Sequence, residues 1–173
     1  MPRPWDALLN AEGLAAAGTV IEREFQIADF ARLADRLAGP DGTVAARLAL
    51  GRSEGVVTGD LRVRASAQLT CQRCLAPMPR TVESESRLAF VESDDAPVPA
   101  DREAIACDPG RLDLAALVED ELLLSLPLIA RHAEGETCGP ADGAAARAAD
   151  ERANAAPEAM RRPFAGLKEL LKH

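Results

Sequence analysis

The residues best suited to chemistry are two cysteines, Cys71 and Cys74, which flank Gln72 and Arg73. The chain has four cysteines in 173 residues, so half of them stand in this Cys-x-x-Cys motif. The spacing lets two thiolates bind one ion, and it suits tetrahedral zinc. Two other interpretations remain open: unliganded thiols in a turn, and a redox pair. A redox pair normally opens a helix whose dipole lowers the thiol pKa, whereas strands are predicted on both sides of this motif.

A closed zinc site needs two further ligands, and the chain offers them after a long gap. Cys138 is the natural third ligand, and His132 is the natural fourth, which gives Cys-x2-Cys followed by His-x5-Cys. The second spacing is slightly wider than usual in zinc proteins, and about 57 residues separate the two pairs. Cys71, Cys74, His132 and Cys138 are therefore the predicted metal ligands. Cys107 is an alternative, but its strand-like surroundings indicate a small buried apolar residue.

The charge of the chain limits the kinds of partner it can bind. The net charge is −8, which argues against a surface dominated by contacts with nucleic-acid phosphates. The charge is uneven, however: residues 44–90 hold seven arginines and four acids, whereas residues 92–138 hold twelve acids and three arginines. The middle of the chain is mildly basic and the following part strongly acidic.

The composition predicts a cytoplasmic protein with an aliphatic core. Hydrophobic residues make up 47% of the chain, but aromatic residues only 3%. No run of about 20 apolar residues is present, so no membrane span is expected. The first residues lack the apolar stretch and cleavage site of a signal peptide. In the cytoplasm thiols stay reduced, so a Cys-x-x-Cys pair favours a metal or redox site over a structural disulfide.

The hydrophobic pattern predicts an α+β fold built on an antiparallel sheet. Alternation of apolar and polar residues, bounded by turn residues, predicts strands at 21–25, 44–50, 57–69, 81–90 and 104–107, with Gly59 a candidate bulge. Helical spacing predicts helices at 27–38 and 113–126, the second capped by Asp113 and stopped by Pro127. The strands form a meander whose turn, at residues 71–79, contains the Cys-x-x-Cys knuckle. We therefore predict an α+β domain over residues 1–134, a flexible linker over 135–160 and a C-terminal short helix or tail over 161–173.

Several charged residues are candidates for partner binding. On the 113–126 helix, Glu119 and Asp120 fall outside the apolar arc and are expected to form a solvated acidic face. Glu121 falls inside the arc, where a carboxylate must find a partner, and Arg73 in the knuckle is our hypothesis for that partner. Arg62 and Arg64 project from the other face of the 57–69 strand. With Arg47, Arg73, Arg80 and Arg87 they form a candidate phosphate-binding face, and the alternative is a solvated face with local ion pairs.

The sequence carries no sign of an enzyme. It lacks a Gly-rich phosphate loop, a nucleophile elbow and paired acids with an evident cleft. It has two histidines, one of them at the C-terminus, which leaves little for histidine-based catalysis. It also lacks interleaved aromatic residues for stacking on single-stranded RNA.

Taken together, the motifs resemble those of the YceD-like proteins, the large ribosomal RNA subunit accumulation proteins of bacteria and plastids. The resemblance covers roughly residues 57–173. It rests on the knuckle and the Val118–Leu122 acidic helix, with His132, Cys138 and a Pro-Phe tail following in order. The tail carries Phe164 and Leu167 at matching positions, but it has Arg162 where the family commonly has asparagine and Gly166 where valine is common.

The resemblance implies a non-enzymatic ribosome biogenesis factor needed for synthesis, processing or stability of 23S ribosomal RNA. The expected partners are large-subunit ribosomal RNA or its precursor, ribosomal proteins, or both, with no membrane and no small-molecule substrate. The candidate partner-binding residues are Arg62, Arg64, Arg73, Glu119, Asp120, Glu121, Phe164 and Leu167. Zinc is the only candidate cofactor. The alternative function is a zinc-stabilised protein-interaction module without a ribosomal role.

Overall fold

The computed structural model describes residues 8–93, 95–133, 136 and 138. The elements, in chain order, are α1 (Ala11–Ala16), β1 (Val20–Gln26), the 3-10 turns η1 (Ile27–Asp29) and η2 (Ala31–Leu33), β2 (Gly42–Ser53), β3 (Val56–Thr70), β4 (Pro77–Val91), β5 (Glu103–Ala106), the 3-10 turn η3 (Pro109–Arg111) and α2 (Leu114–Ser125). Among these residues, every helix is too short or too polar to cross a lipid bilayer. Apart from 136 and 138, the predicted linker and tail lie outside the described residues.

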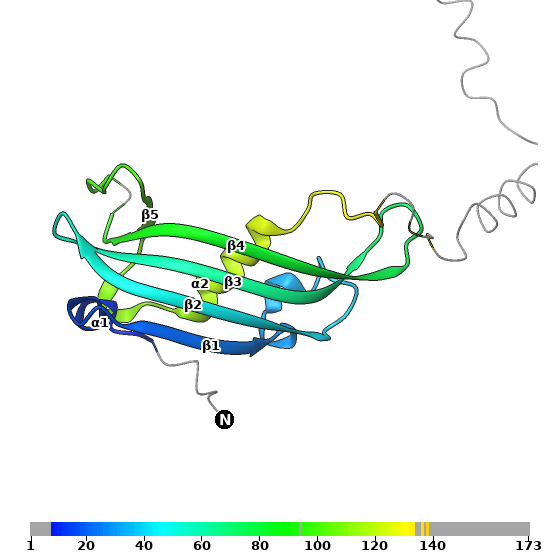
Figure 1. Cartoon of the computed structure of the whole chain (residues 1–173), viewed down its shortest axis with the longest axis horizontal. Coiled ribbons are helices and arrows are strands. Elements are labelled where there is room, and N and C mark those ends of the chain that lie inside the picture. The colour runs from blue at the N-terminus through cyan, green and yellow to red at the C-terminus, as the bar shows by residue number, and fades with distance from the viewer. Residues whose placement is uncertain (1–7, 94, 134–135, 137, 139–173) are drawn as a thin grey trace, which may run out of the picture.

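The five strands form one sheet in the order β1-β2-β3-β4-β5 (Figure 1). The first four are antiparallel to their neighbours, as predicted, but β5 runs parallel to β4, so the sheet is mixed and the prediction of a purely antiparallel sheet is wrong. The reason is the connection that follows β4, which returns the chain to enter β5 in the same direction. Arg102 anchors this connection, since its Nη1 lies 3.0 Å from Asp60 Oδ1 and also donates to the carbonyl oxygen of Gly59.

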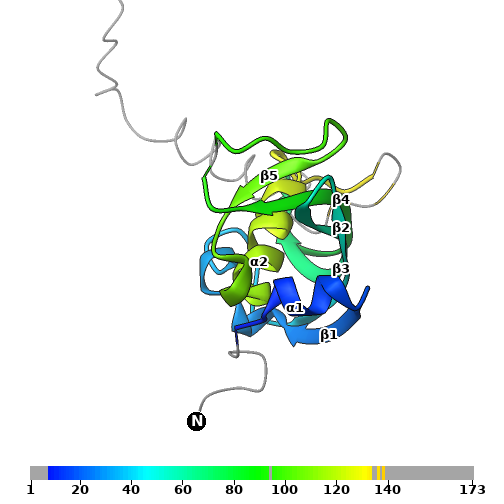
Figure 2. The same cartoon turned by 90° about the vertical axis from the view of Figure 1, so that its left-hand side faces the viewer.

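Strict alternation along β3 separates the two faces of the sheet. The inward residues are apolar and buried, from Leu61 through Val63 and Ala65 to Leu69, whereas Arg62 and Arg64 between them are exposed. Both helices lie on the apolar face, and none of the described elements covers the opposite face of the sheet (Figure 2). Val118 and Leu122 of α2 are fully buried in the core that this packing creates. Burial of aliphatic surface therefore defines which face carries charge.

The turn between β2 and β3 is shorter than the gap between the strands predicted at 44–50 and 57–69. Strand β2 continues to Ser53 and β3 begins at Val56, which leaves a two-residue turn of Glu54 and Gly55. Both turn residues have positive φ, 52° and 82°, as the tight turns that match strand twist require.

The helix predicted at 113–126 is confirmed as α2, and the Asp113 side chain caps it by accepting from the Ala116 N–H at 3.0 Å.

The predicted helix at 27–38 is wrong, because the chain forms two short 3-10 turns there instead. Ile27, Phe30 and Leu33 are all buried, and their spacing of three residues matches the 3-10 period. Phe30 itself is extended, with φ −105° and ψ 96°, and interrupts the segment. Helix α1 was not predicted, because six residues carry too little periodic signal.

Gly59 is a point of close packing rather than a bulge. The ladder runs through it without interruption, pairing it with Leu50 on one side and Leu88 on the other. A Cβ at this position would lie 2.8 Å from Leu48 Cδ1 and 2.9 Å from the Phe90 ring. The absence of a side chain therefore lets the buried Phe90 ring pack over the strand.

We expect Gly59→Ala to lower the free energy of unfolding by about 1–3 kcal/mol, because the added methyl group overpacks the core. Urea denaturation followed by circular dichroism measures this effect. Gly51→Ala in β2 is the matched control, since a Cβ there meets nothing closer than Thr58 Oγ1 at 3.8 Å. Equal stability of the two variants would contradict the packing role of Gly59.

Candidate metal centre

The knuckle that carries Cys71 and Cys74 is shaped by backbone hydrogen bonds. It closes the β3–β4 hairpin: the Cys71 N–H donates to the Ala76 carbonyl at 3.0 Å, and the Leu75 N–H donates to the Cys71 carbonyl at 2.8 Å. Leu75 has φ 59°, the left-handed conformation that reverses the chain after the second cysteine. The Arg73 N–H points to Cys71 Sγ at 3.5 Å. The knuckle thus directs both sulfur atoms inward, and both side chains are buried.

The segment after α2 brings the other two predicted ligands to the knuckle. Pro127 stops the helix, and the chain then runs to the same end of the sheet as the β3–β4 turn (Figure 1). The Gln72 N–H donates to the Ala130 carbonyl at 2.8 Å, and Arg80 donates to the Arg131 carbonyl. These bonds hold the segment beside the hairpin, so that His132 and Cys138 reach the two cysteines.

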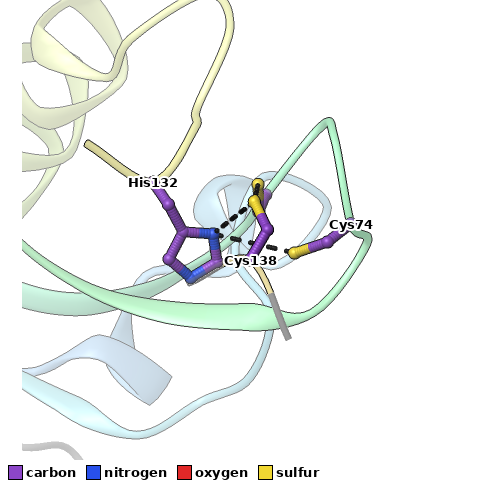
Figure 3. Close-up of side chains that lie close together, drawn as sticks. Cys74, His132 and Cys138 are labelled. Carbon is purple, nitrogen blue, oxygen red and sulfur yellow. Dashed lines mark hydrogen bonds between the residues drawn. The ribbon is translucent and has the colours of Figure 1, made fainter. Parts of the chain in front are cut away.

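The four side chains converge on one point. Figure 3 shows the imidazole of His132 facing Cys74 and Cys138, with Nδ1 at 3.6 Å and 3.4 Å from their sulfur atoms. Cys71 Sγ and Cys138 Sγ lie 3.9 Å apart, and all four donor atoms lie within 4.8 Å of one another. The prediction from the Cys-x2-Cys and His-x5-Cys spacing, that these residues form one cluster, is confirmed.

These distances fit a tetrahedral ion better than a disulfide. Zinc bonds of about 2.3 Å to sulfur and 2.0–2.1 Å to nitrogen put two sulfur ligands about 3.8 Å apart and a sulfur and a nitrogen about 3.6 Å apart. The cysteines are free, and the 3.9 Å separation of Cys71 and Cys138 is far beyond the roughly 2 Å of a disulfide bond. The arrangement is therefore compatible with zinc, and three thiolates with one imidazole form a closed structural donor set.

The electrostatics of the cluster also favour a cation. Burial raises the pKa of the Cys71 thiol, but hydrogen bonds from the backbone of Cys74 and Arg73 and from His132 outweigh it and lower the pKa to about 5. Burial also raises the pKa of Cys138; the Arg73 hydrogen bond opposes this, whereas the neighbouring thiols reinforce it. One thiolate therefore forms readily, but ionising all three in one buried space requires a positive ion among them.

Arg73 adds a positive charge at the edge of the cluster, where its Nε lies 2.8 Å from Cys138 Sγ. Our hypothesis that Arg73 pairs with Glu121 is therefore wrong. Glu121 is buried on α2 and accepts from the hydroxyl groups of Ser84 at 2.9 Å and Ser86 at 2.6 Å, both on β4. The sequence signal for these partners was present, because both serines lie on the inward face of a strand.

The acidic helix is less exposed than predicted. Glu119 is buried, contrary to the predicted solvated face, because Arg32 from η2 lies over it: Glu119 Oε1 accepts from the Arg32 N–H at 2.7 Å, and Oε2 from Arg32 Nε at 2.8 Å. Asp120 is exposed, and its Oδ1 lies 2.6 Å from Arg32 Nη1. Of the three acids predicted to bind partners, only Asp120 has an exposed side chain. The role of Arg32 was missed, since nothing in the sequence links residues 87 positions apart.

The predicted arginine face is only partly present, and acids neutralise the part that is. Arg47, Arg62, Arg64 and Arg87 lie on the open face of the sheet, whereas Arg80 lies on the inward side of β4 and Arg73 lies in the knuckle beside Cys138. Arg62 pairs with Glu85 at 3.1 Å and Arg64 with Glu83 at 3.2 Å across the β3–β4 ladder. Arg47 and Arg87 also have carboxylate partners, Glu22 and Asp101.

Cys107 lies apart from the cluster: it is half-buried against the main core, and burial raises its pKa. Phe164 and Leu167 lie outside the described residues.

Comparison with known proteins places these features in a family. The sequence model of the family described as "Large ribosomal RNA subunit accumulation protein YceD" matches residues 59–171, about two thirds of the chain. This chain belongs to the YceD family. The match begins in β3 and contains Cys71, Cys74, His132 and Cys138 as well as α2. It also confirms the resemblance drawn from the knuckle, the acidic helix and the tail.

A curated relative supports the assignment of the chain to the YceD family. The chain is 38% identical over 76 residues to the Large ribosomal RNA subunit accumulation protein YceD of Haemophilus influenzae. That alignment covers 41% of this chain and 42% of the relative, so the chain spans less than half the length of the relative it matches. No solved structure matches the chain significantly.

The different environments of two adjacent acids give a test. We expect Glu119→Ala to lower the free energy of unfolding by about 1–3 kcal/mol, because a buried acceptor with two hydrogen bonds is lost. Asp120→Ala is the matched control, since it removes an exposed ion pair to the same arginine and should change stability by less than about 1 kcal/mol. Chemical denaturation measures both, and a larger effect of Asp120→Ala would contradict the assignment.

Proposed function

We propose that this YceD-family chain is a non-enzymatic ribosome biogenesis factor, acting in the cytoplasm, that supports the accumulation of 23S ribosomal RNA. The observation that carries the proposal is the family match across residues 59–171, which contains the whole cysteine and histidine cluster. The relative from Haemophilus influenzae carries the same description. The cluster itself supports a non-catalytic role, because four protein ligands fill a tetrahedron and leave no position for a substrate.

In this proposal Cys71, Cys74, His132 and Cys138 hold one structural zinc ion. The ion joins the β3–β4 knuckle to the segment after α2, which lie far apart in the sequence. Three thiolates and one divalent cation leave a single negative charge, and the guanidinium of Arg73 lies beside Cys138 to balance it. The metal thus fixes the end of the sheet and the course of the chain beyond α2.

We further propose that the first contact with the ribosome is made through a ribosomal protein rather than through naked RNA. The arginines of the open sheet face, Arg47, Arg62, Arg64 and Arg87, are each paired with a carboxylate, so this face lacks the excess of positive charge that phosphate binding needs. The net charge of −8 favours a basic protein partner, because opposite charge accelerates association.

Metal analysis tests the proposed zinc site. We expect one zinc ion per chain in protein purified without added metal, and a strong chelator should lower the melting temperature, because structural zinc contributes several kcal/mol to folding. Cys74→Ser should lose the ion, whereas Cys107→Ser, a cysteine outside the cluster, should keep it. Full zinc content in Cys74→Ser, or none in the unaltered chain, would exclude the site.

Recovery of the tagged protein from growing cells, with and without ribonuclease, tests whether a ribosomal protein or RNA is the direct ligand. We expect ribosomal proteins to be recovered in both samples, with Arg62→Glu/Arg64→Glu having little effect. Recovery of large-subunit precursor RNA that is lost with ribonuclease and with this double variant would show RNA to be the direct ligand instead. Recovery of neither would leave the zinc-stabilised interaction module as the better function.

A further inference from the structure

An apolar groove lies beside the metal centre, between the end of α2, the end of β3 and the segment after η2. Its volume is about 620 Å³. Its apolar lining is formed by Leu37, Leu69, Leu123, Leu126, Pro127, Leu128 and Ala130, and Asp35, Arg36, Thr70 and Gln72 form its polar rim. Leu128 is fully exposed, and Ile129 next to it is largely exposed. Concave apolar surface next to exposed large side chains is typical of a docking site.

The position of the groove relative to the chain end suggests its occupant. The described chain ends at Cys138, which packs in one cluster with Leu69 and Ala130, two residues that also line the groove. Thirty-five further residues follow. Residues 139–162 contain a single large apolar side chain, Met160, whereas Phe164, Leu167, Leu170 and Leu171 then recur at helical spacing.

We propose that residues 163–171 of the same chain dock in this groove as an amphipathic helix. Such a helix inserts side chains spaced three and four apart into an apolar groove, the pattern that Phe164, Leu167 and Leu171 form. Glu169 lies on the opposite, polar side of this pattern and remains in solvent. The inference goes beyond the proposed function and depends neither on zinc nor on RNA.

The covalent link to the rest of the chain favours this segment over a separate protein as the occupant of the groove. The random-coil span of about 25 residues, the number between Cys138 and this segment, is roughly 28 Å root-mean-square, which is enough to reach a groove beside Cys138. A tethered segment is present at an effective concentration in the millimolar range, so even weak docking is well populated. A free partner of equal intrinsic affinity at micromolar concentration would be outcompeted. The family match extends from β3 to residue 171. It therefore includes both the groove wall formed by β3 and α2 and the segment that we propose docks there.

Photo-crosslinking in the full-length chain tests the proposal. Benzoylphenylalanine is introduced in place of Leu128, and the crosslinked peptides are identified by mass spectrometry. An equal mixture of ¹⁴N- and ¹⁵N-labelled protein separates contacts within one chain from contacts between copies. We expect crosslinks from position 128 to residues 163–171 of the same copy. The same probe in place of Val20, an exposed residue of β1, should give none.

Substitutions in the segment sharpen the test without disturbing the described core. Phe164→Ala/Leu167→Ala should reduce the crosslink at least fivefold, whereas Glu169→Ala, on the polar side of the segment, should leave it unchanged. Mixed-isotope products would assign the groove to a second copy, and crosslinks to another protein in cells would assign it to a partner. Either result, or a crosslink insensitive to the double substitution, would overturn the proposal.

Discussion

The pairing of β3 on both of its edges is the constraint on which the rest of the fold depends. In β3, residues 56–67 pair with β2 on one side and residues 57–70 pair with β4 on the other, and the inward residues from Leu61 to Leu69 are apolar. A slip of one residue in either register would turn Arg62 and Arg64 into the core, so the alternation fixes the register. The register then determines where β3 ends, and its end delivers Cys71 to the rim of the sheet.

The metal centre joins a local motif to a distant one. The knuckle needs only the backbone bonds of residues 71–76 and the left-handed Leu75, and it is complete within the hairpin. His132 and Cys138 reach it only because α2 packs across the apolar face and Pro127 then releases the chain at the same end. Three neighbouring thiolates in a buried space gain most from a bound cation, since the cation offsets their mutual repulsion. In this way a bound cation links the β3–β4 turn to the segment that follows α2 and stabilises both.

The acidic stretch of α2 shows how charge content misleads when burial is unknown. Glu119 and Glu121 belong to a run of three acids, but each is turned inward onto fixed donors: Arg32 for the first and two serines for the second. A buried carboxylate with two hydrogen bonds serves the fold, because leaving it unpaired would cost more than the bonds contribute. The surface available to partners is therefore less acidic around α2 than the sequence suggested, and the groove beside Leu128 adds an apolar surface that charge counts do not reveal.

The sequence by itself determined the strands of the meander, the capped helix, the knuckle and the identity of the four cluster residues, because alternation, capping and ligand spacing are local properties. It also indicated the YceD family. Only the tertiary structure decided that β5 runs parallel to β4, that residues 27–33 form 3-10 turns, and that Glu121 bonds to β4 rather than to Arg73. These outcomes depend on which surfaces meet across long sequence separations. A hydrophobic pattern states that a side chain must be buried, but the packed structure alone selects its neighbour.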